Sequence, residues 1–186
     1  KFGNTNAILA GDFLLARASA IAAELGPHVV TVLADTLSTL CEGQIREAIG
    51  AKDTDPIVHY LEVLRQKTGS LIESAAALGA YLAGVDDLVS AALANYARNI
   101  GLAFQISDDI LDMKGESVNS GKIIGKDLLA GVHTLPVLSA LAADKANELA
   151  PMLQKVISDE KLIQPIIEKI TQLGGFDVAE LHLESL

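Results

Sequence analysis

Apolar residues recur at every third or fourth position along almost the whole chain, which is the spacing of amphipathic helices. An alternation of apolar and polar residues long enough for a β-strand does not occur in the sequence. The pattern therefore predicts an all-α fold. Its long helices are expected at residues 4–25, about 28–49, 56 to about 82, and 86–112.

Short polar residues, glycine and proline mark the ends of these helices. Asn4 or Thr5 can cap the first helix, and Asp86 can cap the fourth. Pro56 follows Asp55 at the start of the third helix, where its missing N–H costs little. Each helix is thus expected to begin and end near the positions that the apolar pattern indicates.

A glycine-rich polar segment, residues 114–127, follows the fourth helix. Helices are expected to resume over residues 128–143, with shorter ones at about 152–157 and 163–173 and a last amphipathic fragment after Gly174-Gly175. No linker interrupts the 186 residues, so residues 1–186 are expected to form one domain. Because the chain opens directly on a helix start, we expect it to be incomplete at the N-terminus and also at the C-terminus.

Composition refines this picture. Half of the residues are hydrophobic, tryptophan is absent, and alanine and leucine supply the apolar mass, which favours closely packed helices. The small residues of "SAAALGAYLAG" suit close helix contact or the wall of a hollow interior. The net charge is −10 without a basic stripe, so nucleic-acid binding is not expected. The lone Cys41 favours a reducing compartment, and we expect a cytoplasmic protein.

The fourth helix carries an acidic stripe on an otherwise apolar segment, "QISDDILDM". Gln105, Asp108, Asp109 and Asp112 fall on one side of the helix. Like charges four residues apart destabilise a helix, and acid near its C-terminus opposes the helix dipole. One interpretation is a solvated acidic edge; the other is a cavity-facing site for Mg²⁺, which prefers oxygen ligands and shares its shell with phosphate.

Basic residues that could bind such a phosphate occur in two places. Lys114, Lys122 and Lys126 alternate with glycines in the segment after the acidic stripe, which could close over an anion or be an ordinary flexible loop. Lys67 and Thr68 lie among small residues in the third helix. On its own this pair is more typical of a surface lysine than of a ligand-binding lysine.

Five segments in order resemble the trans-prenyltransferase family, the all-α isoprenyl diphosphate synthases. They are "AGDFLLARAS" (10–19), "EGQIRE" (42–47), "RQKTGSLIESAAALGA" (65–80), "GLAFQISDDILD" (101–112) and "SGKIIGKDLLAGVHTLPVL" (120–138). The likeness is nearest to the polyprenyl and geranylgeranyl enzymes. It implies a bundle of long antiparallel helices around a central cavity, and Mg²⁺-dependent condensation of isopentenyl diphosphate with an allylic diphosphate.

The resemblance also implies roles for single residues. Asp108 would bind Mg²⁺ directly, with Asp109 and Asp112 completing the metal site through water or behind the first ligands. Lys67 and Lys122 would hold the allylic diphosphate and Gln105 would hydrogen-bond near it. Gln44 and the Thr68 carbonyl would lie near the developing cation. A homodimer is expected, with membrane association only through the product.

The chain departs from the family pattern in several places. The first aspartate-rich motif and the N-terminal segment that binds isopentenyl diphosphate are not among these residues, so this chain alone is expected to be inactive. Val132 and His133 stand where family members have a lysine before "TLP". Whether His133 replaces that lysine, and how long the product is, cannot be read from the sequence.

Two other classes of protein stay open. A non-catalytic subunit of a heteromeric synthase would fit the missing first motif, although Asp108, Asp109 and Asp112 are intact. A terpene cyclase would use Glu116 at its spacing after Asp108, although Asp112 occupies a Ser/Thr position of that motif. A carboxylate-bridged di-iron bundle needs Glu-x-x-His, which the sequence does not contain.

Overall fold

The computed structural model of the chain describes residues 3–115 and 124–186, and every described element is helical. The all-α prediction is therefore confirmed. The long elements are α1 (Asn4–Leu25), α2 (Pro27–Ile49), α3 (Pro56–Leu64) with its continuation α4 (Ser70–Ala83), and α5 (Asp87–Lys114). Among the described residues, no helix is both long and apolar enough to cross a bilayer.

The predicted cap at Asp86 is confirmed, the predicted cap at Asn4 or Thr5 is wrong, and Asp55 also caps its helix. Asp55 Oδ1 accepts hydrogen bonds from Ile57 N at 2.9 Å and Val58 N at 3.0 Å. Asp86 Oδ1 accepts one from Val89 N at 3.0 Å. Helix α1 instead begins after Gly3, whose φ is 77°, and its first residues provide no side-chain cap.

The third predicted helix contains an irregularity that the apolar pattern did not reveal. Between α3 and α4 the backbone widens into a π turn, η1 (Arg65–Gly69), without interrupting the helix. Such turns hold one extra residue and are frequent at functional sites. Here the wide turn contains both Lys67 and Thr68.

The C-terminal part is built from short helices: α7 (Lys126–Leu129), α8 (Leu135–Ala143), α9 (Leu149–Val156), η2 (Glu160–Leu162), α10 (Ile163–Gln172) and α11 (Gly175–Glu184). Helices do resume over 128–143, as two separate elements, α7 and α8. Gly131 adopts φ 71°, which ends α7, and α8 starts afresh with Pro136 in its first turn. The loop between them faces the candidate site described below.

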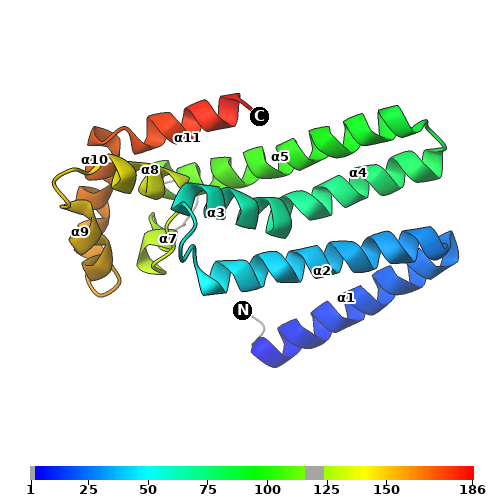
Figure 1. Cartoon of the computed structure of the whole chain (residues 1–186). Helices are drawn as coiled ribbons and strands as arrows, with labels where there is room; N and C mark the ends of the chain where they lie inside the picture. Colours follow the sequence, from blue (N-terminus) through cyan, green and yellow to red (C-terminus); the bar gives the residue numbers. More distant parts are fainter. Residues whose placement is uncertain (1–2, 116–123) are drawn as a thin grey trace.

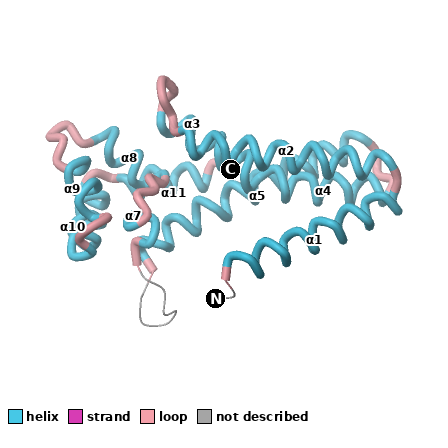
Figure 2. The backbone as a smooth tube through the Cα atoms, turned by 90° about the horizontal axis from the view of Figure 1, so that it is seen from below, coloured by secondary structure: helices cyan, strands magenta, loops and turns pink. Residues whose placement is uncertain are grey.

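The long helices form two hairpins that run side by side, α1 with α2 and α3–α4 with α5 (Figure 1). The short helices α7 to α10 gather at one end of these hairpins, and α11 returns along α5. Seen from below, the N-terminal end of α1 diverges from the other long helices (Figure 2). Several large apolar side chains of α1 are exposed, including Phe13 at 65 % and Leu14 at 67 %.

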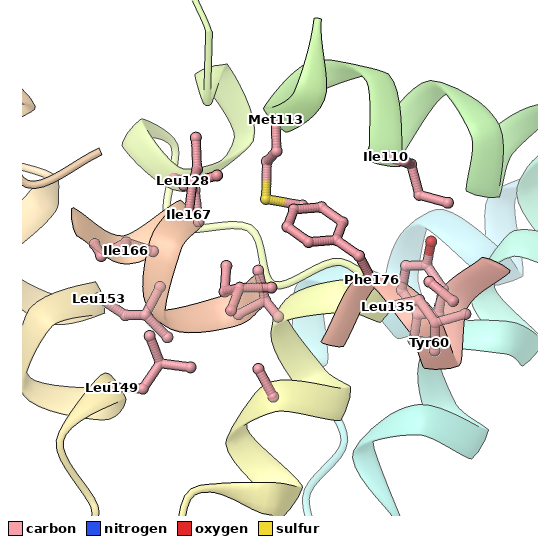
Figure 3. Close-up of a cluster of buried hydrophobic side chains, with 14 of the residues drawn as sticks. Tyr60, Ile110, Met113, Leu128, Leu135, Leu149, Leu153, Ile166, Ile167 and Phe176 are labelled. Carbon is pink, nitrogen blue, oxygen red and sulfur yellow. The ribbon is translucent and has the colours of Figure 1, made fainter. Parts of the chain in front are cut away.

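The main hydrophobic cluster joins the short helices to the ends of α3 and α5. Figure 3 shows Met113 of α5 pointing toward Phe176 of α11, and Tyr60 of α3 beside Leu135 of α8. Phe176 and Leu135 are almost completely buried. This cluster fixes the C-terminal end of α5, where the acidic stripe lies, against α3 and the loop before α8.

Glycines bring the long helices into direct backbone contact beside the π turn. A Cβ atom on Gly101 of α5 would lie 2.9 Å from the Cα atom of Gly69. A Cβ on Gly43 of α2 would lie 2.8 Å from the Cβ of Gln66. Real Cβ atoms do not pack this closely, so both approaches require glycine. The wide turn is thereby clamped between α2 and α5.

Candidate active site

A cavity of about 760 Å³ lies where the ends of α2 and α5 meet α3, the π turn and the loop before α8. Apolar side chains of α3 and α8 form one part of its wall. The polar part of the wall includes Glu47, Lys67, Thr68, Gln105, Asp109 and Asp127. The cavity thus brings together a cation, neutral hydrogen-bonding groups and carboxylates from segments that are distant in the sequence.

Lys67 and Thr68 reach this cavity because they lie on the π turn. Lys67 Nζ forms an ion pair with Glu47 Oε2 of α2 at 2.7 Å, and both side chains are more than a third exposed. Gln44 Nε2 donates to the same Glu47 oxygen at 2.8 Å. Lys67 is therefore held at the cavity by a carboxylate that the sequence did not single out.

A chain of hydrogen bonds runs from the π turn to the acidic stripe. Thr68 Oγ1 donates to Gln105 Oε1 at 3.2 Å, and Gln105 Nε2 donates to Asp109 Oδ1 at 3.1 Å. The hydroxyl of Tyr60 donates to the other oxygen, Asp109 Oδ2. Both oxygens of this buried carboxylate therefore have donors, as a buried ionisable group requires.

The pKa of Asp109 is raised from 3.8 to about 6, chiefly because burial disfavours the charged form. The hydrogen bonds from Tyr60 and Gln105 oppose this rise, while the charges of Asp127 and Asp108 add to it. The pKa of Tyr60 is raised above its usual range, first by burial and then by the charge of Asp109. At neutral pH Tyr60 is thus the proton donor of the pair.

The acidic stripe does not face the cavity as a whole. Gln105 and Asp109 line it, whereas Asp108 is exposed beside it. Asp112 Oδ2 accepts a hydrogen bond from the backbone N–H of Asp127 at 3.1 Å, and the Asp112 carbonyl accepts one from Gly125 N at 2.8 Å. Asp112 therefore anchors the chain where it returns toward α7.

Asp127 is a fourth carboxylate that sequence reasoning missed. It is half-buried and lines the cavity. Burial raises the pKa of Asp127, the charges of Asp112 and Asp108 raise it further, and Lys126 partly opposes them. Its presence in the stretch 120–138 that matched the family could have been a signal, but nothing in the local pattern distinguished it from a surface aspartate.

These side chains fit a hard divalent cation. All the ligand atoms they offer are carboxylate oxygens, and the repulsion that raises the pKa of Asp127 is relieved by a positive ion. In the described residues, no three Asp, Glu, His or Cys side chains converge into a ready-made metal cage.

The structure locates most of the predicted site residues. Lys67, Thr68, Gln105 and Asp109 converge on one cavity, and Gln44 is linked to it through Glu47. Lys122 and Glu116 lie outside the described residues. His133, Val132 and the buried Thr134 line the cavity, so the loop before "LP" does reach the site. The sequence did not indicate a role for Tyr60, because a tyrosine among apolar residues is typical of a hydrophobic core.

Comparisons with known proteins show which family the chain belongs to. The polyprenyl synthetase family matches residues 1–170 of the chain. The chain belongs to this family. Nonaprenyl diphosphate synthase of Mycobacterium tuberculosis is 49 % identical over 178 residues, which cover 94 % of this chain and 53 % of that protein. The resemblance found in the sequence is thereby confirmed.

Solved structures of the family share the fold. Geranylgeranyl pyrophosphate synthase from Corynebacterium glutamicum, in complex with calcium and isoprenyl diphosphate, matches with a TM-score of 0.84 and 41 % identity, covering 98 % of this chain and 57 % of that one. Polyprenyl synthase from Caulobacter crescentus matches with a TM-score of 0.88 and 31 % identity, covering 99 % and 58 %. The chain spans about half the length of the curated relatives it matches.

Proposed function

We propose that this chain carries the diphosphate- and metal-binding half of a trans-prenyltransferase that condenses isopentenyl diphosphate with an allylic diphosphate to give a polyprenyl or geranylgeranyl diphosphate. The observation that supports this most strongly is the convergence of Lys67 on the π turn with Asp109 and Asp127 on one cavity. The names of the relatives agree with this reaction.

The proposed reaction begins with loss of diphosphate from the allylic substrate. Mg²⁺, when bound, neutralises charge on the leaving diphosphate. Asp108, which is exposed and whose charge acts on both Asp109 and Asp127, is the proposed direct ligand, while Asp112 and Asp127 would contact its waters. Lys67 would exchange its ion pair with Glu47 for the diphosphate oxygens. Such preorganised charges stabilise the transition state because they need little rearrangement.

The carbon skeleton would then lie between the π turn and α5. Gln105 Oε1, which accepts from Thr68 Oγ1, and the carbonyl oxygen of Thr68 would present partial negative charge there, which favours a developing carbocation. The apolar wall from α3 and α8 would exclude water from that cation. A homodimer, a cytoplasmic location and contact with membranes only through the product are part of the same proposal, carried by the likeness to the family.

The test uses the full-length protein with Mg²⁺, an allylic diphosphate and labelled isopentenyl diphosphate. Asp108→Ala is expected to lower product formation by at least about 100-fold, the usual scale for loss of a key electrostatic group. Asp35→Ala, an exposed aspartate of α2, is the matched control and should leave the rate unchanged. Calorimetry with Mg²⁺ and pyrophosphate should show binding to wild type and not to Asp108→Ala.

Other outcomes would identify the alternatives. Unchanged turnover in Asp108→Ala would refute the proposed metal role. Absence of product together with no pyrophosphate binding to wild type would favour a non-catalytic subunit. Release of diphosphate from the allylic substrate without consumption of isopentenyl diphosphate would favour a terpene cyclase.

A further inference from the structure

Tyr60 connects three elements at the back of the cavity. It lies on α3, its hydroxyl donates to Asp109 on α5, and it packs in the hydrophobic cluster that includes Leu135 at the start of α8. Tyr60 is 9 % exposed and Asp109 is 5 % exposed. The reaction proposed above does not require a tyrosine here, so the position needs an explanation of its own.

Hydrogen-bond direction gives that explanation. An ionised carboxylate can only accept hydrogen bonds, so Gln105 must turn its NH₂ group toward Asp109. The amide oxygen of Gln105 then necessarily faces the other way, toward Thr68 Oγ1, which donates to it at 3.2 Å. The charge on Asp109 therefore decides which end of the Gln105 amide faces the π turn.

Asp109 can set this orientation only if its own carboxylate is fixed. Its Oδ1 is directed at Gln105 and its Oδ2 at Tyr60, so the tyrosine prevents rotation of the carboxylate about its last bond. The tyrosine ring is itself held in the hydrophobic cluster beside Leu135 (Figure 3). Tyr60 therefore fixes the carboxylate of Asp109, and Asp109 in turn orients the amide of Gln105.

We propose that Tyr60 is a positioning residue that fixes Asp109 as the acceptor that orients Gln105, with the amide oxygen of Gln105 toward the reacting carbon, so that Asp109 serves this purpose instead of binding the metal. This inference rests on the proposed function. It separates the two adjacent aspartates: the exposed Asp108 is left for the metal ion, and the buried Asp109 holds Gln105 in the interior.

Tyr60→Phe removes the hydroxyl and keeps the ring in the hydrophobic cluster. We expect kcat to fall about 10-fold, the scale of losing one hydrogen bond to a charged group. The KM for the allylic diphosphate and the calorimetric affinity for Mg²⁺ with pyrophosphate should stay within about twofold of wild type, because Lys67 and Asp108 are untouched. Tyr96→Phe is the matched control, since Tyr96 is 66 % exposed.

A charge-conserving exchange tests the direction of the hydrogen bonds. In Asp109→Asn, the new amide keeps its oxygen toward Tyr60 and presents NH₂ to Gln105, which must then turn its oxygen away from Thr68. Adding Gln105→Glu supplies a carboxylate that accepts from both Asn at 109 and Thr68. We expect Asp109→Asn to lower kcat at least 10-fold. The kcat of the double variant should be at least threefold higher than that of Asp109→Asn.

A readout without turnover separates this inference from the proposed function. The side-chain NH₂ resonance of Gln105, assigned by its loss in Gln105→Glu, should shift in Tyr60→Phe and stay unchanged in Tyr96→Phe. An unshifted resonance, or a double variant no more active than Asp109→Asn, would overturn the role of Tyr60. If wild type forms no product, the proposed function fails, while the resonance still reports on the orientation of Gln105.

Discussion

Lys67 Nζ lies 2.7 Å from Glu47 Oε2, so the cation proposed to bind the substrate diphosphate is already paired with a carboxylate. Substrate must therefore compete with Glu47. We predict that Glu47→Gln tightens the binding of Mg²⁺ with pyrophosphate by up to about fivefold, because a half-exposed ion pair is worth up to about 1 kcal/mol. Isothermal calorimetry at low ionic strength measures this difference.

Glu62→Gln is the matched control for that experiment. Glu62 pairs with Arg65 at 2.7 Å, so the variant makes the same charge change in a pair whose members do not line the cavity. Its pyrophosphate affinity should equal that of wild type. Equal affinities in all three proteins would mean that Glu47 does not restrain Lys67.

The buried Asp109 predicts a pH-dependent stability. Its pKa is 3.8 when unfolded and about 6 in the fold, so folding favours the protonated form. The stabilisation is complete below pH 3.8 and is lost as the pH rises through 6, an amount of about 3 kcal/mol. Asp109→Asn should therefore gain stability relative to wild type between pH 4 and 7, as measured by urea unfolding in the presence of EDTA.

Asp35→Asn controls for the loss of one carboxylate, because Asp35 is exposed on α2. Its difference from wild type should not change over the same pH range in the way that Asp109→Asn does. Parallel curves of unfolding free energy against pH for wild type and Asp109→Asn would contradict a raised pKa of Asp109 in the folded protein. The same variant is expected to lose activity, so stability and catalysis conflict at this position.

The contact between Gly101 and Gly69 predicts a specific intolerance to alanine. Gly101→Ala would bring a Cβ to 2.9 Å from a backbone atom that cannot move aside, and we expect a loss of about 1–3 kcal/mol in unfolding free energy. Gly79→Ala on α4 is the control, because nothing lies within 4 Å of its Cβ position. That variant should be up to about 1 kcal/mol more stable, since alanine favours a helix. Chemical denaturation distinguishes the two.

The hydroxyl of Thr134 is buried and has no hydrogen-bond partner among the described residues, although Thr134 lines the cavity. Replacing it by the isosteric valine should raise the unfolding free energy by about 1 kcal/mol, because an unsatisfied buried hydroxyl is removed. Pyrophosphate affinity should not change, since the oxygen is not accessible from the cavity. Ser139→Ala, which removes the other such hydroxyl away from the cavity, should stabilise similarly.

A weaker pyrophosphate affinity in Thr134→Val, measured by calorimetry beside Ser139→Ala, would contradict this reasoning. It would show that the Thr134 hydroxyl rotates to contact the diphosphate. Thermal unfolding with and without pyrophosphate gives the same comparison in one experiment, because a ligand that binds only the folded state raises the unfolding midpoint.

The long helices could be predicted from sequence because their apolar residues repeat with helical spacing and their ends carry Asp55-Pro56, Asp86 and glycine. The π turn could not, since a single extra residue disturbs that spacing only slightly. The position of the break between α7 and α8 could not be predicted, because residues 128–143 contain no Asp, Glu, Lys or Arg and the sequence alone does not show where Gly131 turns the chain.

The candidate site was predicted only in part for a similar reason. Asp108 and Asp109 are adjacent and chemically identical in the sequence, and only their burial distinguishes the exposed Asp108 from the buried Asp109. Glu47 and Tyr60 contribute through contacts across 20 and 49 residues of sequence. Local patterns carry no information about such distant partners.

The extra residue in η1 also bears on how related sequences should be aligned. A regular α-helix rotates successive side chains by about 100°, so removing one residue between Tyr60 and Gly69 would turn everything after the deletion by that angle. Gly69 would no longer meet Gly101, and Tyr60 could not reach Asp109 in the same molecule. An evolutionary gap inside residues 65–69 should therefore be rare in any homologue that keeps both contacts.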